Sequence, residues 1–286
     1  MFKVPFDYYA PDNLQKAVAL REQFKGKSRI LAGGTDLLIA LQKEDLGCEA
    51  IIDIKKVDEL KGIEKKDHYL AVGANVPFAN LMCHSLIKKY TPLMAQASST
   101  VGSPQIRNRG TVGGNLGTGS AAGDLLTALV ALEAIVVVTG FKGLRQVPVT
   151  DFLGGNNAEK LQNTEIIREV RIPLGENQNI RSAFIKLGRR KALAVSRLSL
   201  ALNLEMQEEF VAKARLSVGA AGPIPFRVIE AEQILAQKNN KFEAKKVMDL
   251  VSYAVLDSLG ERPSAPYKIV AVKGLVLEAL QKCGLI

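Results

Sequence analysis

Leu31-Ala32-Gly33-Gly34-Thr35-Asp36 is one of two glycine-rich stretches in this chain, and Thr111-Val112-Gly113-Gly114-Asn115-Leu116-Gly117-Thr118-Gly119 is the other. In both, a Gly-Gly pair lies beside a threonine and is followed by residues that predict a helix. Paired glycines let a backbone approach a bulky anion closely, because no Cβ atom lies in the way. The stretches lie about eighty residues apart in a basic protein. Together they predict one elongated ligand that carries more than one phosphate.

The bulk composition limits the classes of protein that this chain can be. Its 286 residues are enough for two domains with a buried core. The net charge of +9 suits a nucleic acid, an anionic cofactor or an acidic partner subunit. Tryptophan is absent, aromatic residues make up only 6%, and we find no nucleic-acid-binding motif. The charge therefore favours an anionic cofactor or an acidic partner, and we expect no nucleic acid.

The cysteines and histidines predict no metal site. Cys48, Cys83 and Cys283 are widely spaced without a C-x-x-C pair, and His68 and His84 are the only histidines. No apolar run approaches the length of a membrane span, and the first residues do not resemble a signal peptide. We therefore expect a cytoplasmic protein that does not bind a membrane.

The order of predicted elements indicates an α+β protein. Residues 1–55 read as β-α-β-α-β, with Asp12 as the expected N-cap of the first helix. Residues 56–172 predict a second α+β unit, and the polar turn-rich stretch 175–179 predicts a linker. After it we expect strands near 182–187, 195–205 and 211–219, and helices near 226–236, 243–257 and 267–282. The predicted domains are 1–174, with subdomains of about 1–55 and 56–174, and 178–286.

Two common phosphate-binding motifs do not fit the glycine stretches. The complete G-x-x-x-x-G-K-[ST] pattern of a P-loop is absent. Gly117 to Gly123 is one residue too long for a Rossmann fingerprint, follows no strand, and lacks an acid about twenty residues later. What remains is a pair of nest-like loops that donate backbone N–H groups to a pyrophosphate. The plainer alternative, two strand-to-helix turns with threonine and aspartate caps, stays open.

Several side chains near these loops suit the same ligand. Thr35, Thr111, Asn115 and Thr118 add hydrogen-bonding groups, and the Asp124 carboxylate can accept bonds from ribose or ribityl hydroxyls. Two further side chains, Arg107 and Arg109, precede the second loop. They either neutralise the pyrophosphate or hold the loop through structural contacts.

Longer segments around these loops resemble a known family. Ala32 to Leu38 and Gln105 to Asn115 closely resemble the FAD-binding medium subunit of molybdenum hydroxylases, which include xanthine, nicotinate and carbon monoxide dehydrogenases. The resemblance covers essentially the whole chain. It continues through Asp151-Phe152, Glu165-Ile166-Ile167, Ile172-Pro173, Phe184-Ile185-Lys186 and Gly219 to Arg227.

The resemblance implies a vanillyl-alcohol-oxidase-type FAD-binding domain of two subdomains, followed by a smaller α+β C-terminal domain. FAD would bind both loops at once, so we expect the cofactor to bring them together. Tyr267-Lys268 departs from the family's frequent Tyr-Arg pair. The implied cofactor-binding residues are Ala32, Gly33, Gly34, Thr35, Asp36, Thr111, Gly113, Gly114, Asn115, Thr118, Asp124, Ile166, Ile167 and Lys186.

The resemblance also implies a function. A large subunit would hydroxylate a substrate, expected to be an N-heterocycle, at molybdenum. Electrons would pass through [2Fe-2S] clusters of a small subunit to FAD, and then to NAD or another acceptor, in a dimer of heterotrimers. The chemistry belongs to the flavin, so we expect no catalytic residue and no metal ligand in this chain.

The residues leave two alternatives open. A free-standing FAD-dependent oxidase of the same fold is the alternative function, although neither histidine lies in a motif for covalent flavin. Lys186, Arg189, Arg190 and Lys191 form a cationic run that either supports an anionic flavin or acceptor, or is a solvated turn.

Overall fold

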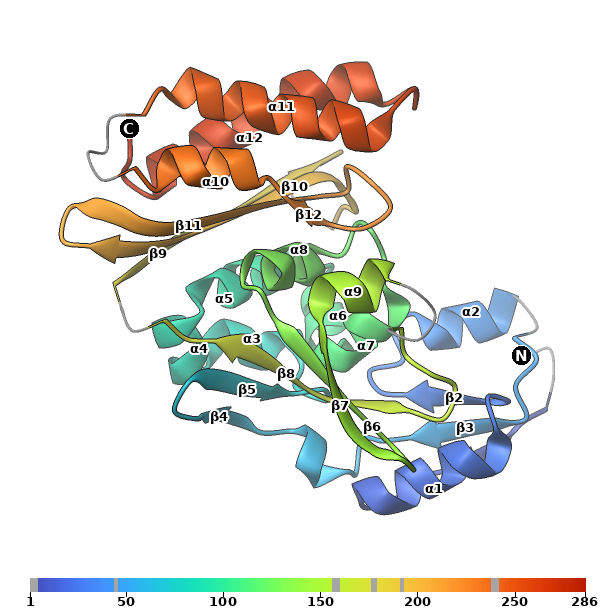
Figure 1. Cartoon of the computed structure of the whole chain (residues 1–286). Coiled ribbons are helices and arrows are strands. Elements are labelled where there is room, and N and C mark those ends of the chain that lie inside the picture. Colours follow the sequence, from blue (N-terminus) through green and yellow to red (C-terminus); the bar gives the residue numbers. More distant parts are fainter. Residues whose placement is uncertain (1–4, 44–45, 156–159, 176–178, 191–192, 238–241) are drawn as a thin grey trace.

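The computed structural model describes residues 5–43, 46–155, 160–175, 179–190, 193–237 and 242–286. Within them the chain forms three sheets, as Figure 1 shows. The predicted linker lies mostly outside the described residues, as does Lys191. None of the described helices is both long enough and apolar enough to cross a bilayer.

The N-terminal sheet is parallel, with strand order β1-β3-β2. All four residues of β3 are buried, because this central strand is covered on both faces. Asn13 caps α1 by accepting a bond from the Lys16 amide at 2.9 Å, so the prediction of Asp12 as the cap is wrong by one residue. The elements are β1 (Asp7–Tyr9), α1 (Leu14–Phe24), β2 (Ser28–Leu31), α2 (Leu37–Lys43) and β3 (Ala50–Asp53).

The second sheet has five strands in the order β4-β5-β8-β6-β7, and all its pairs are antiparallel. Its helices include α8, which is buried at every position and forms the centre of the largest hydrophobic cluster. The strands are β4 (Ile63–Lys65), β5 (Tyr69–Gly73), β6 (Ile135–Gly140), β7 (Gly143–Pro148) and β8 (Ile166–Pro173). The helices are the 3-10 helix η1 (Asp58–Leu60), α3 (Phe78–Cys83), α4 (Ser85–Tyr90), α5 (Pro92–Ser99), α6 (Pro104–Arg109), α7 (Val112–Thr118), α8 (Asp124–Ala131) and α9 (Val149–Gly154).

The C-terminal sheet is antiparallel, with strand order β12-β11-β10-β9. Helices α10, α11 and α12 cover one face, and α5 and α8 of the preceding unit pack against the other (Figure 1). The elements are β9 (Ile180–Gly188), β10 (Ser196–Gln207), β11 (Phe210–Gly219), β12 (Phe226–Arg227), α10 (Ile229–Leu235), α11 (Ala244–Leu259) and α12 (Ala265–Lys282).

Buried polar contacts fix the C-terminal sheet against α8. Thr127 shares a hydrogen bond of 3.0 Å with Ser199, and its carbonyl accepts one of 2.7 Å from the Ser217 hydroxyl. A Cβ atom on Gly219 would lie 1.9 Å from Thr127 Oγ1, so this close approach requires glycine. These contacts hold the C-terminal sheet at a fixed distance from α8.

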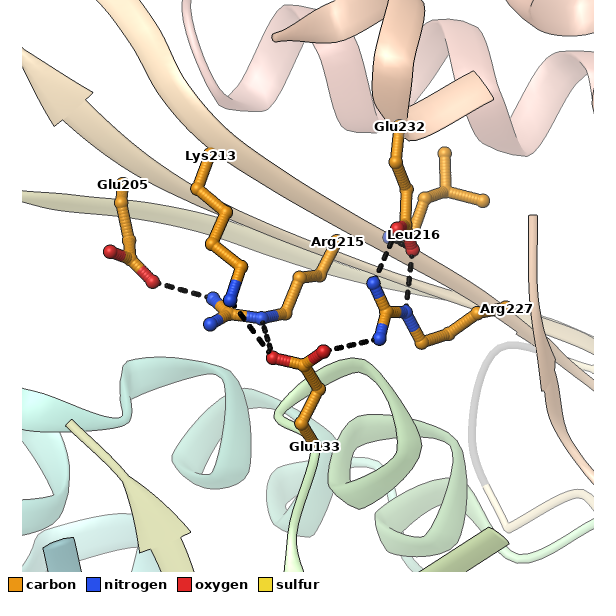
Figure 2. Close-up of polar contacts among 7 residues, drawn as sticks. All are labelled: Glu133, Glu205, Lys213, Arg215, Leu216, Arg227 and Glu232. Atoms are coloured by element: carbon orange, nitrogen blue, oxygen red, sulfur yellow. Dashed lines mark hydrogen bonds and ion pairs between the residues drawn. The ribbon is translucent and has the colours of Figure 1, made fainter. Parts of the chain in front are cut away.

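An ionic network adds to this interface, and Figure 2 shows it. Glu133, which follows α8, accepts bonds from Arg215 at 2.5 Å and from Arg227 at 2.5 Å. On the sheet side, Arg215 also binds Glu205, and Arg227 binds Glu232. The Arg215 side chain is only 8% exposed, so its charge needs both carboxylates.

Acid should weaken this network. Burial alone would raise the pKa of Glu133, but the bonds and charges of Arg215, Lys213 and Arg227 outweigh it and hold the pKa at about 2, below the ordinary 4.5. Because the pKa is lowered in the folded state, the stabilisation is complete above pH 4.5 and is lost as the pH falls towards 2. We expect urea unfolding free energies to fall less steeply in this range for Glu133→Gln than for the wild type. Parallel pH curves for the two proteins would contradict this.

Candidate functional site

The first glycine stretch is a tight turn between β2 and α2. Gly34 has a φ of +79°, a left-handed conformation that favours glycine, and its carbonyl accepts the Leu38 amide at 3.2 Å. The backbone amides of Gly33, Gly34 and Thr35 have no acceptor among the described residues. Three consecutive unpaired N–H groups in a turn are suited to an anion such as a phosphate.

The second glycine stretch is mostly helical, because Val112–Thr118 forms α7. Thr111 is its N-cap and accepts the Gly114 amide at 3.0 Å, while the Gly113 amide donates to the Ala74 carbonyl at 2.7 Å. Both glycine amides are thus already paired, so the expectation that this stretch offers them as free donors is wrong. A Cβ atom on Gly113 would lie 2.6 Å from the Cβ of Ala74, which makes close packing the reason for this glycine.

The two stretches contact each other directly. A Cβ atom on Gly33 would lie only 2.0 Å from the Arg109 carbonyl oxygen, and Thr118 donates a hydrogen bond of 3.0 Å to Asp36. Protein contacts therefore join the loops, and a cofactor is not needed to bring them together. Arg107 contributes to the same arrangement, because it donates to the carbonyls of Val101 and Gly102 at 3.0 Å each. These contacts support the structural role of Arg107, which is to hold the loop, and not the neutralisation of a pyrophosphate.

Asn115 supplies a further feature of the second stretch. Its Oδ1 atom is buried and has no hydrogen-bond partner among the described residues. An unsatisfied buried acceptor is costly unless a bound group donates to it, and a hydroxyl is such a group. Unpaired amides in one loop and an unpaired acceptor in the other fit a ligand that carries both phosphates and hydroxyls. FAD has both.

Asp124 and Lys186 form a buried ion pair at the interface of α8 and β9. Their N–O distance is 2.6 Å, and the side chains are 3% and 15% exposed. Asp124 also accepts bonds from Thr100 at 2.9 Å and from Ser196 at 2.5 Å, and the Lys186 ammonium donates to the Thr100 carbonyl at 2.9 Å. Three donors occupy the carboxylate, so Asp124 holds Lys186 in place and keeps one free acceptor position on Oδ1.

The two isoleucines lie on opposite faces of β8 and are both buried. Ile166 packs in a cluster with Ala17 and Ile52 of the first unit, and Ile167 packs in the main cluster of the second. They line the contact between the two units, and their proximity to a flavin or adenine ring stays a prediction.

Comparison with known proteins places this site in a family. The model for the FAD binding domain in molybdopterin dehydrogenase matches residues 4–175, which is more than half of the chain. This chain belongs to that family. The model for the CO dehydrogenase flavoprotein C-terminal domain matches residues 183–282. The chain is thus an FAD-binding oxidoreductase subunit of the molybdenum hydroxylase type.

Individual relatives agree with this assignment over nearly all of their length. The chain is 35% identical to the nicotinate dehydrogenase FAD-subunit of Eubacterium barkeri, covering 94% of this chain and 93% of that protein. It is 27% identical to the glyceraldehyde dehydrogenase medium chain of Sulfolobus acidocaldarius, covering 99% of each. The structure of carbon monoxide dehydrogenase from Hydrogenophaga pseudoflava has a chain 28% identical to this one, with a TM-score of 0.87 and coverage of 99% and 98%. The expected α+β fold of an FAD-binding domain and a C-terminal flavoprotein domain is confirmed.

Two further residues of the site in this flavoprotein belong to no recognisable sequence motif. Thr100 and Ser196 both bind Asp124, from positions 24 and 72 residues away. Only the fold places them together, so no local pattern in the sequence indicates them.

Proposed function

We propose that this chain works in the cytoplasm as the electron-transfer subunit of a molybdenum hydroxylase. It would receive electrons from the [2Fe-2S] clusters of a small subunit and pass them to NAD or another acceptor. A large molybdenum subunit would complete a heterotrimer, and two heterotrimers would pair. The name of the nicotinate dehydrogenase relative supports an N-heterocycle as the substrate of the complex. The observation that carries the proposal is the row of unpaired amides at Gly33, Gly34 and Thr35.

We assign the residues around that row to FAD. The three amides would donate to the pyrophosphate, and Asn115 Oδ1 would accept a bond from a hydroxyl. Gly114 would let the ligand approach the start of α7 closely, whereas Gly113 holds α7 against Ala74. The full proposed set keeps every residue that the resemblance implies: Ala32, Gly33, Gly34, Thr35, Asp36, Thr111, Gly113, Gly114, Asn115, Thr118, Asp124, Ile166, Ile167 and Lys186.

When bound, FAD supplies the ring that carries the electrons. In the proposal, Lys186 keeps its ammonium at a fixed place, where the positive end of its ion pair with Asp124 would lower the free energy of a nearby negative charge. Its bonds to Asp124 and to the Thr100 carbonyl fix the position of the ammonium group. Water molecules therefore need not rearrange around it when a negative charge forms nearby. We therefore expect Lys186 to act through its charge and not as an acid or base.

The test is reduction of flavin in the purified complex. We expect a visible flavin spectrum that bleaches when nicotinate or xanthine is added anaerobically and recovers on addition of NAD⁺ or another oxidant. Release of the FAD chain should stop electron transfer to the acceptor while the substrate still reduces the iron–sulfur clusters. A complex that transfers electrons equally well without this chain would contradict the proposal. So would an isolated FAD chain that oxidises a substrate directly.

A further inference from the structure

The turn that follows β11 joins the C-terminal unit to the backbone of the proposed FAD site. The Ala220 amide donates a hydrogen bond of 2.9 Å to the Ala121 carbonyl. Ala121 belongs to the turn of residues 120–123, which connects α7 to α8. This turn lies between Thr118 and Asp124, two residues that we assign to FAD. A displacement of Ala220 would therefore act directly on the backbone that spaces these two residues.

Ala220 has a backbone conformation that residues other than glycine seldom adopt. Its φ of +56° lies in the left-handed region, which costs free energy for a residue with a Cβ atom. Such a conformation persists only where the surrounding structure holds it. The next two residues are tightly packed, since Ala221 is fully buried and a Cβ atom on Gly222 would lie 2.2 Å from Ser258 Oγ of α11. The position of the turn is thus set by the C-terminal helices.

Lys268 of α12 supplies the second hydrogen bond to Ala220. Its ammonium donates to the Ala220 carbonyl at 2.5 Å. The Lys268 side chain is half-buried and has no carboxylate partner among the described residues. Both backbone groups of Ala220 are therefore bonded, its carbonyl to Lys268 and its amide to Ala121. A charged donor makes a stronger bond than a neutral one, so Lys268 is well suited to hold the left-handed residue in place.

We propose that Lys268 is a positioning residue of the FAD site, which acts through Ala220 and the turn of residues 120–123. The bond from Lys268 fixes Ala220, and Ala220 fixes the turn that leads into α8. At the start of α8, Asp124 holds the Lys186 ammonium at 2.6 Å. The inference rests on the proposed function, since it requires FAD at this site. It goes beyond that function by assigning a role in cofactor binding to a residue of the C-terminal helix α12.

The experiment is a titration of the full apo chain with FAD, followed by the visible circular dichroism of the bound flavin at saturation. We expect Lys268→Met, which keeps the length of the side chain but removes the donor, to weaken FAD binding about tenfold. We also expect it to change the dichroism of the bound flavin, because the residues around the ring shift. Lys268→Arg keeps a charged donor and should restore both the affinity and the spectrum.

A neighbouring hydrogen bond of the same helix provides the matched control. Ser252 of α11 donates to the Ile269 carbonyl of α12 at 2.6 Å. Ser252→Ala therefore removes a bond between a side chain and a carbonyl next to Lys268, without a link to residues 120–123. It should bind FAD like the wild type and give the same spectrum. Ala220→Gly added to Lys268→Met should recover part of the lost affinity, because glycine adopts the left-handed conformation freely.

The remaining outcomes overturn the inference. Unchanged FAD affinity and dichroism in Lys268→Met would show that Lys268 does not position the site, although the proposed function would stand. Equal losses in Lys268→Met and Ser252→Ala would reduce the role of Lys268 to the packing of α12. If Lys268→Met does not fold, Lys268→Gln, with a shorter and neutral donor, takes its place in the same comparisons. A wild type that binds no FAD would contradict the proposed function and the inference together.

Discussion

Replacing Gly33 with alanine is expected to weaken FAD binding by about a hundredfold, because it pushes the two glycine loops apart. The new Cβ atom would lie 2.0 Å from the Arg109 carbonyl oxygen, which belongs to the backbone and cannot rotate away. Forcing an extra carbon into a packed contact costs about 1–3 kcal/mol, and each 1.4 kcal/mol changes an affinity about tenfold. The shift acts on the amides proposed to bind the pyrophosphate. Fluorescence titration with FAD measures the effect.

A second glycine provides the control for this variant. Gly274 lies in the exposed middle of α12 with nothing near its ideal Cβ position, so Gly274→Ala should raise helix stability slightly and leave FAD binding unchanged. If Gly33→Ala unfolds the chain, Thr118→Val removes only the hydrogen bond between the loops and should weaken FAD binding by a smaller factor. Wild-type FAD affinity in a folded Gly33→Ala protein would refute the proposed role of the paired loops.

Asp124→Asn is expected to destabilise the protein by about 3 kcal/mol, because it removes the one carboxylate that neutralises Lys186. Both side chains are largely buried, so the remaining ammonium would lie in a poorly solvated place with only neutral acceptors, the Thr100 carbonyl and the amide oxygen of the new asparagine. We expect FAD binding to weaken as well, since Lys186 and Ser196 lose their fixed positions. Chemical denaturation of the apo chain separates the effect on stability from the effect on cofactor binding.

The same substitution at a surface ion pair is the control. Asp249 pairs with Lys273 at 2.6 Å, but their side chains are 36% and 42% exposed. Ion pairs of this kind contribute less than about 1 kcal/mol, so Asp249→Asn should change the unfolding free energy little. Equal effects of the two substitutions would show that burial does not distinguish these pairs, and the role given to Asp124 would be wrong.

The sequence predicts the order of the elements well where the periodicity of apolar residues is strong. The β-α-β-α-β start, the long strands β10 and β11 and the C-terminal helices α11 and α12 all agree with the expected positions. The short strand β12 does not, because the sequence predicts a helix near 226–236 that would include its two residues. Pairing with Ser217 and Val218 of β11 makes these two residues a strand. The local sequence around them does not indicate this pairing.

The glycine-rich start of α7 shows a similar limit. The helix contains Gly113, Gly114 and Gly117 and ends at Gly119, and so many glycines disfavour a helix. The helix forms because Thr111 caps it and because Gly113 packs closely on Ala74. The contact with Ala74 depends on the tertiary arrangement, since Ala74 lies about forty residues earlier in the chain.

The candidate site can also be predicted from the sequence only in part. The sequence indicates the two glycine loops, since close backbone approach needs glycine and leaves a visible pattern. It does not indicate which amides are already paired, nor the bonds of Thr100 and Ser196 to Asp124. The network of Glu133 with Arg215 and Arg227 also joins residues far apart, and in the sequence each of them is an ordinary surface charge.

The first glycine stretch is proposed to bind FAD through its pyrophosphate, and a comparison of FAD with riboflavin tests this binding. Riboflavin has the same ring and ribityl chain but no phosphate. In titrations of the full apo chain, we predict one FAD per chain, bound at least a hundredfold more tightly than riboflavin, because two phosphates meet the unpaired amides of Gly33, Gly34 and Thr35. Equal affinity for the two flavins, or no FAD bound at all, would contradict a pyrophosphate site at these amides.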